Sequence, residues 1–396
     1  MLHVRGLCVA VAALTALPSC LSSPEFFGGG PRTSGDAGRL GGGAGGGAAG
    51  GHMGGGPGGS GAGGGGTAGQ GGGPPDAGLG VRASRSSSIA MLRGLRVSVN
   101  PDLPGLAVEG TTFPIFPSSS EPSALAGLPN GDLVVTLRHA QELAYVSGLP
   151  SAPTVSWRVR VCSEPAGVAV SPSGRTAVVA CLGDDVAVFV DTATRDVRGV
   201  PLSGVARAVA VTNDGDLDDA DERAYVPLFF GIPLQEGSDV GRVGRVVEID
   251  LGSAQVRRTI DLAPLAQLVA GPVAPGPPPP CAPNQLHAIA VANGRAWVSH
   301  SCVAPQAPLH KFLSVGSGIS VIDLASGTEL TQESTTLGRI VGLMGPPTAS
   351  LLGVPIDLDV NPQGTMLVVL SQAANRVVPL MVRPGAPRCR PSPACR

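Results

Sequence analysis

The feature that most constrains this chain is a recurring block of short apolar runs separated by turn residues. In its clearest copy, an apolar run at 166–170 leads through the turn Ser-Pro-Ser-Gly into further runs at 176–181 and 186–190. Apolar runs of this length without strict alternation are typical of strands covered on both faces. The block therefore predicts a unit of four short strands, of which the fourth is weak.

Copies of the block begin near residues 123, 166 and 206, so the spacing is 43 and then 40 residues. Later copies begin near 287 and 356 after insertions, and a fainter copy begins near 88. Four short strands at a period in the low forties are the pattern of propeller blades. We therefore predict an all-β fold, a β-propeller of six to seven four-stranded blades over residues 81–382.

The blocks resemble the repeats of YVTN-type bacterial surface propellers. Residues 165–174 read Pro-Ala-Gly-Val-Ala-Val-Ser-Pro-Ser-Gly, and residues 188–194 read Val-Phe-Val-Asp-Thr-Ala-Thr. The resemblance implies a propeller fold and specifies no reaction. The chain also resembles the propeller part of surface proteins that continue into a di-haem peroxidase domain, and we expect no haem domain here because no Cys-x-x-Cys-His motif occurs.

The first residues are typical of an export signal. A short basic start precedes an apolar run ending at Leu17, which is too short to cross a bilayer as a helix. Leu17-Pro18-Ser19-Cys20 resembles the bacterial lipoprotein cleavage box. We predict a lipoprotein-type signal peptide at 1–19 and lipidation of Cys20; a plain cleaved signal with a chance cysteine is the alternative. The predicted location is a membrane-anchored lipoprotein in the periplasm or at the cell surface.

Residues 20–80 are predicted to be a disordered Gly-rich tether. Of the 59 glycines, 29 lie between residues 28 and 80, where few side chains can bury apolar area. Such a segment does not offset its conformational entropy by folding. The final residues, 383–396, are predicted to be an irregular tail rich in Arg, Pro and Cys.

Cysteines are expected to form disulfides because an exported protein meets an oxidising compartment. Counted outward from the turns, Cys162 and Cys181 fall at the open end of one hairpin, and Cys281 and Cys302 at the open end of another. Cys389 with Cys395 is a third candidate pair. Free buried thiols are the alternative.

The same count from the Asn293-Gly294 turn places His287 opposite His300. Residues that face each other across a hairpin have Cβ atoms about 5 Å apart, close enough to share a metal ion. The other interpretation is two histidines hydrogen-bonded at a strand end.

An acidic loop interrupts the third clear copy. It holds six acids in nine residues, namely Asp214, Asp216, Asp218, Asp219, Asp221 and Glu222. The carboxylates at 214, 216 and 218 match the first ligands of a calcium loop, although Asp219 stands where such loops have Gly and Tyr225 where they have Glu. We predict a Ca²⁺ site, and a solvated loop is the alternative. No other cofactor is predicted.

Composition and motifs narrow the function. The net charge is −2, aromatic residues are 3% and Lys311 is the single lysine, so no nucleic-acid partner is expected. Phosphate-loop, serine-hydrolase and zinc-protease motifs do not occur. We expect a lipid-tethered module that binds an envelope protein or glycan without enzymatic activity. The alternatives are a lactonase-like propeller enzyme and an electron-transfer accessory that docks a separate haem peroxidase.

Overall fold

The computed structural model describes residues 83–235, 241–266, 279–304, 315–337, 354–372 and 376–382. These residues belong to one compact unit. They form strands β1 to β26. Within this described part, no apolar helix has the length needed to span a membrane.

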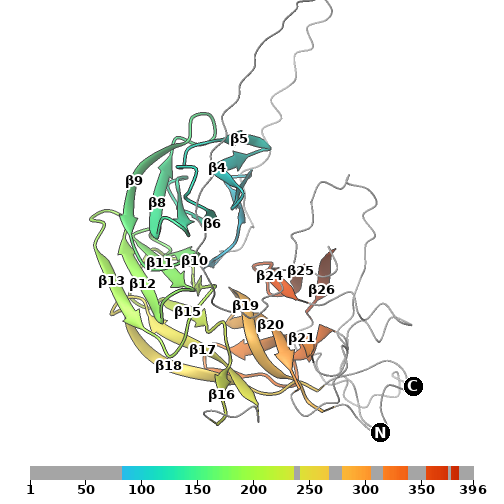
Figure 1. The fold of residues 1–396 in the computed structure, drawn as a ribbon. Helices are drawn as coiled ribbons and strands as arrows, with labels where there is room; N and C mark the ends of the chain where they lie inside the picture. Colours follow the sequence, from blue (N-terminus) through green and yellow to red (C-terminus); the bar gives the residue numbers. More distant parts are fainter. Residues whose placement is uncertain are drawn as a thin grey trace, which may run out of the picture. The chain divides into compact units, whose positions relative to one another are not determined.

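The strands form six antiparallel sheets, which are the blades of a β-propeller and follow one another in chain order (Figure 1). Blade 1 contains β2 (Ile89–Leu92), β3 (Leu95–Asn100), β4 (Leu103–Val108) and β5 (Thr111–Phe113). Blade 2 contains β6 (Pro122–Gly127), β7 (Leu133–Leu137), β8 (Glu142–Ser147) and β9 (Thr154–Arg160). Blade 3 contains β10 (Pro165–Val170), β11 (Thr176–Cys181), β12 (Val186–Asp191) and β13 (Val197–Pro201).

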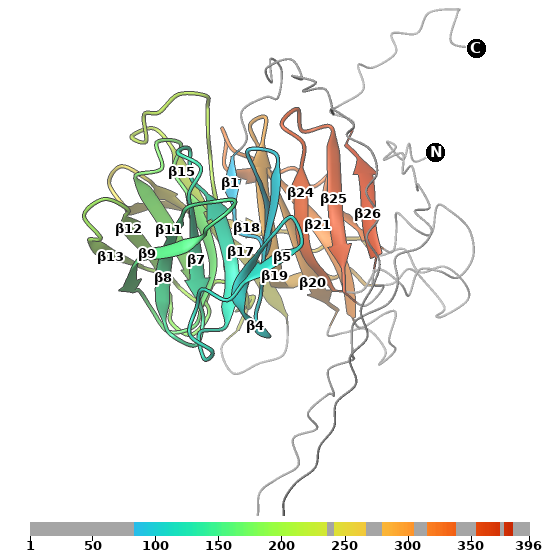
Figure 2. The ribbon, with the colours of Figure 1, turned by 90° about the horizontal axis from the view of Figure 1, so that it is seen from above.

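The last three blades are less regular. Blade 4 contains β14 (Ala210–Val211), β15 (Arg223–Pro227), β16 (Ile232–Pro233), β17 (Arg242–Asp250) and β18 (Gln255–Leu262). Blade 5 contains β19 (Ala282–Ala292), β20 (Arg295–Val303), β21 (Val315–Asp323), β22 (Thr328–Glu329) and β23 (Thr335–Thr336). Blade 6 has three described strands, β24 (Pro355–Val360), β25 (Met366–Ser371) and β26 (Arg376–Met381). Strands within the blades run side by side with turns at both ends (Figure 2).

Tight turns set the strand register where the chain reverses. Asn293 (φ 47°) and Gly294 (φ 70°) form the two-residue turn between β19 and β20, and both occupy the left-handed region that such hairpin turns require. Gly174 (φ 75°) closes the turn between β10 and β11. A Cβ atom there would lie 2.7 Å from the Pro129 ring. Both the positive φ and this close approach favour glycine at the position.

Apolar side chains on the broad faces of the sheets hold the blades together. Five buried clusters join blade 1 to 2, 2 to 3, 3 to 4, 4 to 5 and 5 to 6. Between blades 2 and 3, for example, Val134 packs with Val168 and Val179. This packing explains why the strands are apolar on both faces, as the sequence pattern predicts.

No sixth cluster joins blade 6 to blade 1 among the described residues. Instead the face of blade 6 turned away from blade 5 carries exposed apolar side chains in cross-strand pairs, Met366 with Met381 and Leu370 with Val377. On blade 1, Ile89 and Met91 of β2 are also exposed. The described blades therefore form a series that is continuous from blade 1 to blade 6.

The prediction of an all-β propeller of six to seven blades is confirmed, and the structure has six. In blade 6, three strands lie in the described part of the chain. The predicted signal peptide at 1–19, with Cys20, the tether at 20–80 and the tail at 383–396, with Cys389 and Cys395, lie outside the described residues.

Candidate functional site

The segment before blade 1 is bonded to the inner strands of several blades. Strand β1 (Ser84–Arg85) pairs with β14 of blade 4, and Ser87 forms an isolated bridge with Leu125 of blade 2. The Ser84 hydroxyl accepts a hydrogen bond from the backbone N–H of Val170 in blade 3 (2.9 Å). Because inner strands of a propeller surround its axis, a segment bonded to several of them lies on that axis.

Arg85 links this segment to blade 6. Its guanidinium donates to the Asp357 carboxylate (2.9 Å) and to that of Asp359 (3.0 Å), and the Ser87 hydroxyl also donates to Asp357 (2.9 Å). Burial alone would lower the pKa of Arg85, but the two carboxylates outweigh it and the pKa is raised. The segment is therefore held on the axis by ionic and backbone bonds.

A cavity of about 400 Å³ opens beside this segment, at the end of the axis where the inner strands finish. Its apolar wall comes from Met91 and Leu92 of β2, the end of β6 and the end of β19. Its polar groups include Arg85, Ser87, Arg96 and Asp359. The lining therefore combines apolar and polar groups in comparable shares, and both kinds of group take part in ligand sites.

Sequence reasoning missed these axial residues. Asp357 and Asp359 alternate within a strand that otherwise reads Ile, Leu and Val, and Arg85 stands among serines. Acids at alternate positions point to one face of a strand. The alternation of Asp357 and Asp359 could therefore have predicted a charged group on one face of the inner strand of blade 6.

Both predicted hairpin disulfides are present. Cys162 pairs with Cys181 and Cys281 with Cys302, with Cα atoms 6.2 and 5.3 Å apart. Both lie within the usual range for this bond. The alternative of free thiols at these four positions is wrong.

The expected facing of His287 and His300 is wrong. The count from the Asn293-Gly294 turn holds as far as Ala288, but a bulge follows and Leu286 stands opposite His300. The two imidazoles bond instead to hydroxyls, His287 Nε2 to Ser301 (3.0 Å) and His300 Nε2 to Ser320 (3.2 Å).

Both histidines are buried, and the Nδ1 atom of each lacks a hydrogen-bond partner. Burial lowers the pKa of His287 to about 4, with a further contribution from the charge of Arg207. Burial also lowers the pKa of His300 to about 3. Cys281 and Cys302 are joined to each other, so the thiols nearest in sequence do not supply further ligands. Neither histidine belongs to a group of three ligating side chains in the described part of the chain.

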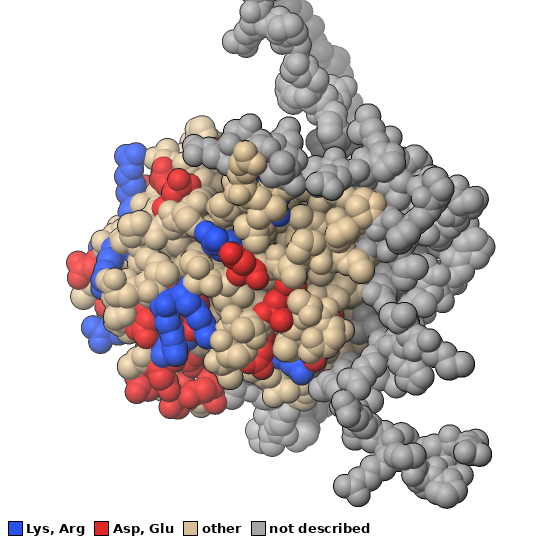
Figure 3. Space-filling model, turned by 90° about the horizontal axis from the view of Figure 1, so that it is seen from below, with Lys and Arg blue, Asp and Glu red and all other residues tan. Residues whose placement is uncertain are grey.

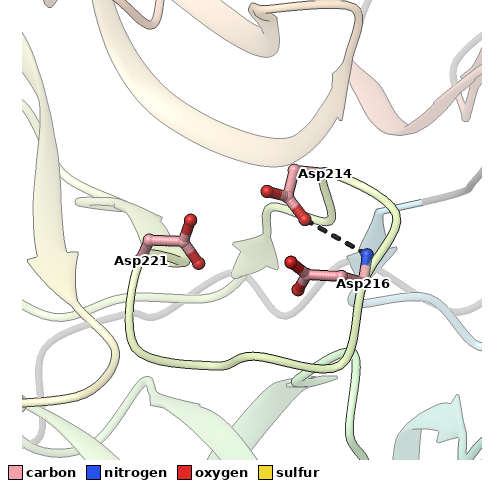
Figure 4. Close-up of side chains that lie close together, drawn as sticks. All are labelled: Asp214, Asp216 and Asp221. Atoms are coloured by element: carbon pink, nitrogen blue, oxygen red, sulfur yellow. Dashed lines mark hydrogen bonds between the residues drawn. The ribbon is translucent and has the colours of Figure 1, made fainter.

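The acidic loop brings together three carboxylates, but not the three that the calcium spacing predicts. Asp214, Asp216 and Asp221 each offer an oxygen within 4.8 Å of the others (Figure 4). Asp218 lies outside this group and accepts a hydrogen bond from the Ala220 N–H (2.9 Å). The predicted set of 214, 216 and 218 is therefore corrected to 214, 216 and 221.

The remaining acids of the loop have structural contacts. Asp219 accepts hydrogen bonds from the hydroxyl (2.5 Å) and N–H (3.1 Å) of Ser173, which ties the loop to blade 3. Glu222 is buried, bonds to the Thr212 hydroxyl and accepts from the Asp214 N–H (2.9 Å). Burial raises the pKa of Glu222. Three clustered oxygens suit a hard cation such as Ca²⁺, with the other ligands coming from water or backbone.

Charges elsewhere on the described surface are locally balanced. Basic and acidic side chains stand beside one another on the face drawn in Figure 3. Ion pairs between described residues include Arg158 with Glu142 (3.1 Å) and Arg245 with Asp261 (2.6 Å).

Comparison with known proteins supports the fold. No protein-family model matches the chain, and no curated protein matches it in sequence. A solved structure of hydrazine synthase from Kuenenia stuttgartiensis is similar, with a TM-score of 0.50, 15% identity, and 74% of this chain and 94% of that chain covered. A streptogramin B lyase matches with a TM-score of 0.43 and 11% identity, covering 74% of this chain and 78% of that one. The dihydro-heme d1 dehydrogenase NirN matches with a TM-score of 0.41 and 15% identity, covering 75% and 57%.

These structures correct one expectation. The expectation that this chain has no enzymatic activity is contradicted, because the same fold occurs in hydrazine synthase, and the fold and the missing motifs therefore do not exclude catalysis. At such identities the likeness shows the fold alone. A propeller of this kind is compatible with an enzyme and with a binding module, because function lies in the site that the blades carry.

Proposed function

We propose that this chain is an exported, lipid-anchored propeller of the YVTN type that binds a ligand from the cell envelope in its axial cavity. In this proposal Cys20 carries the lipid, residues 20–80 form the tether, and the propeller is presented in the periplasm or at the cell surface. The observation that carries the binding role is the cavity of about 400 Å³ beside Arg85, which is within the usual size range of ligand sites.

Two properties of the cavity support the proposal. Strands β1, β2, β3, β6, β19 and β24 contribute to its wall, so the backbone around the cavity is already ordered and little conformational entropy is lost when a ligand enters. Two of its charged groups, Arg85 and Asp359, are already fixed in an ion pair, and Ser87 adds a hydroxyl. A glycan hydroxyl or a peptide amide would find both donors and acceptors here.

Narrowing the cavity tests the proposal. Met91 lines it and is 60% exposed, so Met91→Trp adds bulk at the cavity wall without disturbing a buried position. Val197, which is 43% exposed on the outer strand of blade 3, provides the control variant Val197→Trp. The full-length proteins are immobilised and probed with a panel of envelope oligosaccharides and with an envelope protein fraction.

We expect the wild type and Val197→Trp to retain the same ligand, and Met91→Trp to retain at least about tenfold less. If the two tryptophan variants retained equal amounts of the ligand, the axial cavity would not be the binding site. Retention of nothing by the wild type would contradict the binding role itself.

A further inference from the structure

Arg207 differs from the other half-buried arginines of the described chain. Seven of them donate to a carboxylate or a backbone carbonyl, namely Arg85, Arg138, Arg223, Arg242, Arg245, Arg258 and Arg295. The guanidinium of Arg207 has no hydrogen bond or ion pair with any described residue. Burial partly removes its five N–H donors from water, and no acceptor of a described residue takes the place of that water.

The partly buried position of Arg207 makes the lack of an anionic partner energetically unfavourable. Burial lowers the pKa of Arg207, the charge of Arg138 at the end of β7 lowers it further, and Asp357 opposes both. Asp357 is already bonded to Arg85 and Ser87. Arg207 of blade 4 is therefore influenced by the charges of Arg138 from blade 2 and Asp357 from blade 6. Because Asp357 is already paired with Arg85, Arg207 has no carboxylate of its own.

This group lies at the end of the axis opposite the cavity. Arg207 precedes β14, Arg138 follows β7 at the level where β6 begins, and His287 stands at the middle of β19, before the residues of that strand that line the cavity. The cavity, by contrast, is lined by the last residues of β6, β19 and β24. The two sites are therefore distinct, and the inference below does not rest on the proposed function.

Aromatic side chains provide an apolar wall beside the cation. The guanidinium carbon of Arg207 lies 6.0 Å from the Phe229 ring centre. Phe229 meets Phe230 edge-on at 4.8 Å, and Phe230 is 51% exposed. On its other side Phe229 contacts the buried His287 ring at 5.6 Å. A ligand on Arg207 would contact both a charge and an aromatic surface.

We propose that Arg207, with Phe229 and Phe230 as an apolar wall, binds the carboxylate of an organic acid that carries an apolar group. A guanidinium offers two parallel N–H donors, which match the two oxygens of a carboxylate. The aromatic wall favours an acid with an apolar body over a small inorganic anion. One free guanidinium beside neutral His287 also suits a single negative charge better than a phosphate dianion.

Benzoate is the probe, with acetate and inorganic phosphate as comparison ligands at matched ionic strength. Binding to the full-length protein is measured by calorimetry and by the shift in melting temperature. We expect saturable benzoate binding, with acetate and phosphate weaker. Phosphate binding tighter than benzoate would overturn the assignment to an apolar carboxylate.

Arg207→Gln tests the residue, and Arg198→Gln is the matched control because Arg198 is exposed on β13. Arg207→Gln should weaken benzoate binding at least about tenfold, while Arg198→Gln leaves it unchanged. Without ligand, Arg207→Gln should melt at the same or a higher temperature than the wild type, because an unpaired charge is removed. A lower melting temperature would show that Arg207 is structural, and unchanged benzoate affinity would also overturn the proposal.

The His287 ring gives an independent readout. Arg207 contributes to the lowered pKa of His287, so an anion on Arg207 should raise that pKa towards its ordinary value. The titration of the His287 ring is followed by NMR with and without benzoate. A pKa that stays unchanged at saturating benzoate would place the bound anion elsewhere.

Discussion

Arg85 and Asp357 form an ion pair of 2.9 Å across 272 residues of sequence. This contact joins the first described strand to the inner strand of the last blade. It also fixes the polar side of the axial cavity, because Arg85 and Asp359 both line that cavity. The pair is partly buried, with 16% and 22% of the two side chains exposed.

Removing the cation should destabilise the propeller. Arg85→Met leaves Asp357 and Asp359 without their common partner, and we expect the free energy of unfolding to fall by about 2 kcal/mol. Urea denaturation measures the change. Arg96→Met is the control, since the Arg96–Glu109 pair is 68% and 42% exposed and should contribute less than about 1 kcal/mol. Equal losses in both variants would contradict a stabilising role for the axial pair.

The Cys162–Cys181 bond should stabilise the third blade. It closes a loop with a sequence separation of 19, and the chain-entropy relation gives about 3 kcal/mol for a loop of this size. Cys162→Ser combined with Cys181→Ser should therefore lower the melting temperature, and a reducing agent should have less effect on the variant than on the wild type. Peptide mapping without reduction checks the pairing, and a cross-blade pair would contradict the hairpin assignment.

The sequence was informative wherever local rules set the structure. The 40-residue spacing, the turn residues and the apolar runs predicted the blades, because each blade repeats the same turn and packing chemistry. The count from Asn293-Gly294 correctly gave Ala288 opposite Ser299. It failed one step later, at a bulge that shifts the register and that no residue type announces.

The residues near the axis were not predictable for a different reason. Arg85 and Asp357 beside the cavity, and Arg207 at the other end, come from three distant parts of the chain, and the repeat pattern assigns no role to any of them. Their meeting depends on how the blades surround the axis, which periodicity does not specify. In the acidic loop the residue types were correct, but the path of the loop brings Asp221 and not Asp218 to Asp214 and Asp216, and residue spacing alone does not give that path.

Histidine burial should make stability depend on pH. In the folded protein the pKa of His300 is lowered to about 3 and that of His287 to about 4, whereas both return to about 6.5 on unfolding. The unfolded chain therefore binds more protons between about pH 4 and 6.5, so stability rises with pH across this window and is lost as pH falls. Each histidine should contribute up to about 1.4 kcal/mol per pH unit.

His300→Leu tests this dependence. Unfolding by urea at pH 7, 6 and 5 should show a smaller loss for the variant than for the wild type, by up to about 1.4 kcal/mol per unit at the acidic end. His139→Leu is the control, because His139 is exposed. Parallel curves for wild type and His300→Leu would mean that His300 takes up its proton while folded.

Lipidation at Cys20 is tested by fractionation in a bacterial host. Cys20→Ser removes the acceptor thiol, and we expect the variant to move from the membrane fraction to the soluble fraction. A lipid chain contributes about 0.8 kcal/mol per buried CH₂, so its loss should change partitioning by orders of magnitude. Cys8→Ser, within the predicted signal, is the control that should stay with the membrane. Continued membrane association of Cys20→Ser would contradict the anchor.

Calcium should stabilise the propeller through the acidic loop. The carboxylates of Asp214, Asp216 and Asp221 gather within 4.8 Å, and like charges at this distance repel one another unless a cation lies between them. We expect weak binding, with a dissociation constant of about 10⁻⁴ to 10⁻³ M as in extracellular modules. At ten times that constant, binding to the folded state adds about 1.4 kcal/mol and raises the melting temperature by roughly 2 °C over the value in EDTA.

The choice of aspartates separates the observed cluster from the calcium-loop spacing. Asp214→Asn, Asp216→Asn and Asp221→Asn combined should abolish the calcium response and raise the melting temperature in EDTA, because the repulsion is removed. Asp218→Asn alone should keep the response, since its carboxylate lies outside the cluster and accepts a backbone hydrogen bond. Melting curves in EDTA and in about 10 mM calcium, ten times the upper end of the expected range, measure both. Identical wild-type curves would mean that the loop is solvated, and a loss of response in Asp218→Asn would restore the original set of ligands.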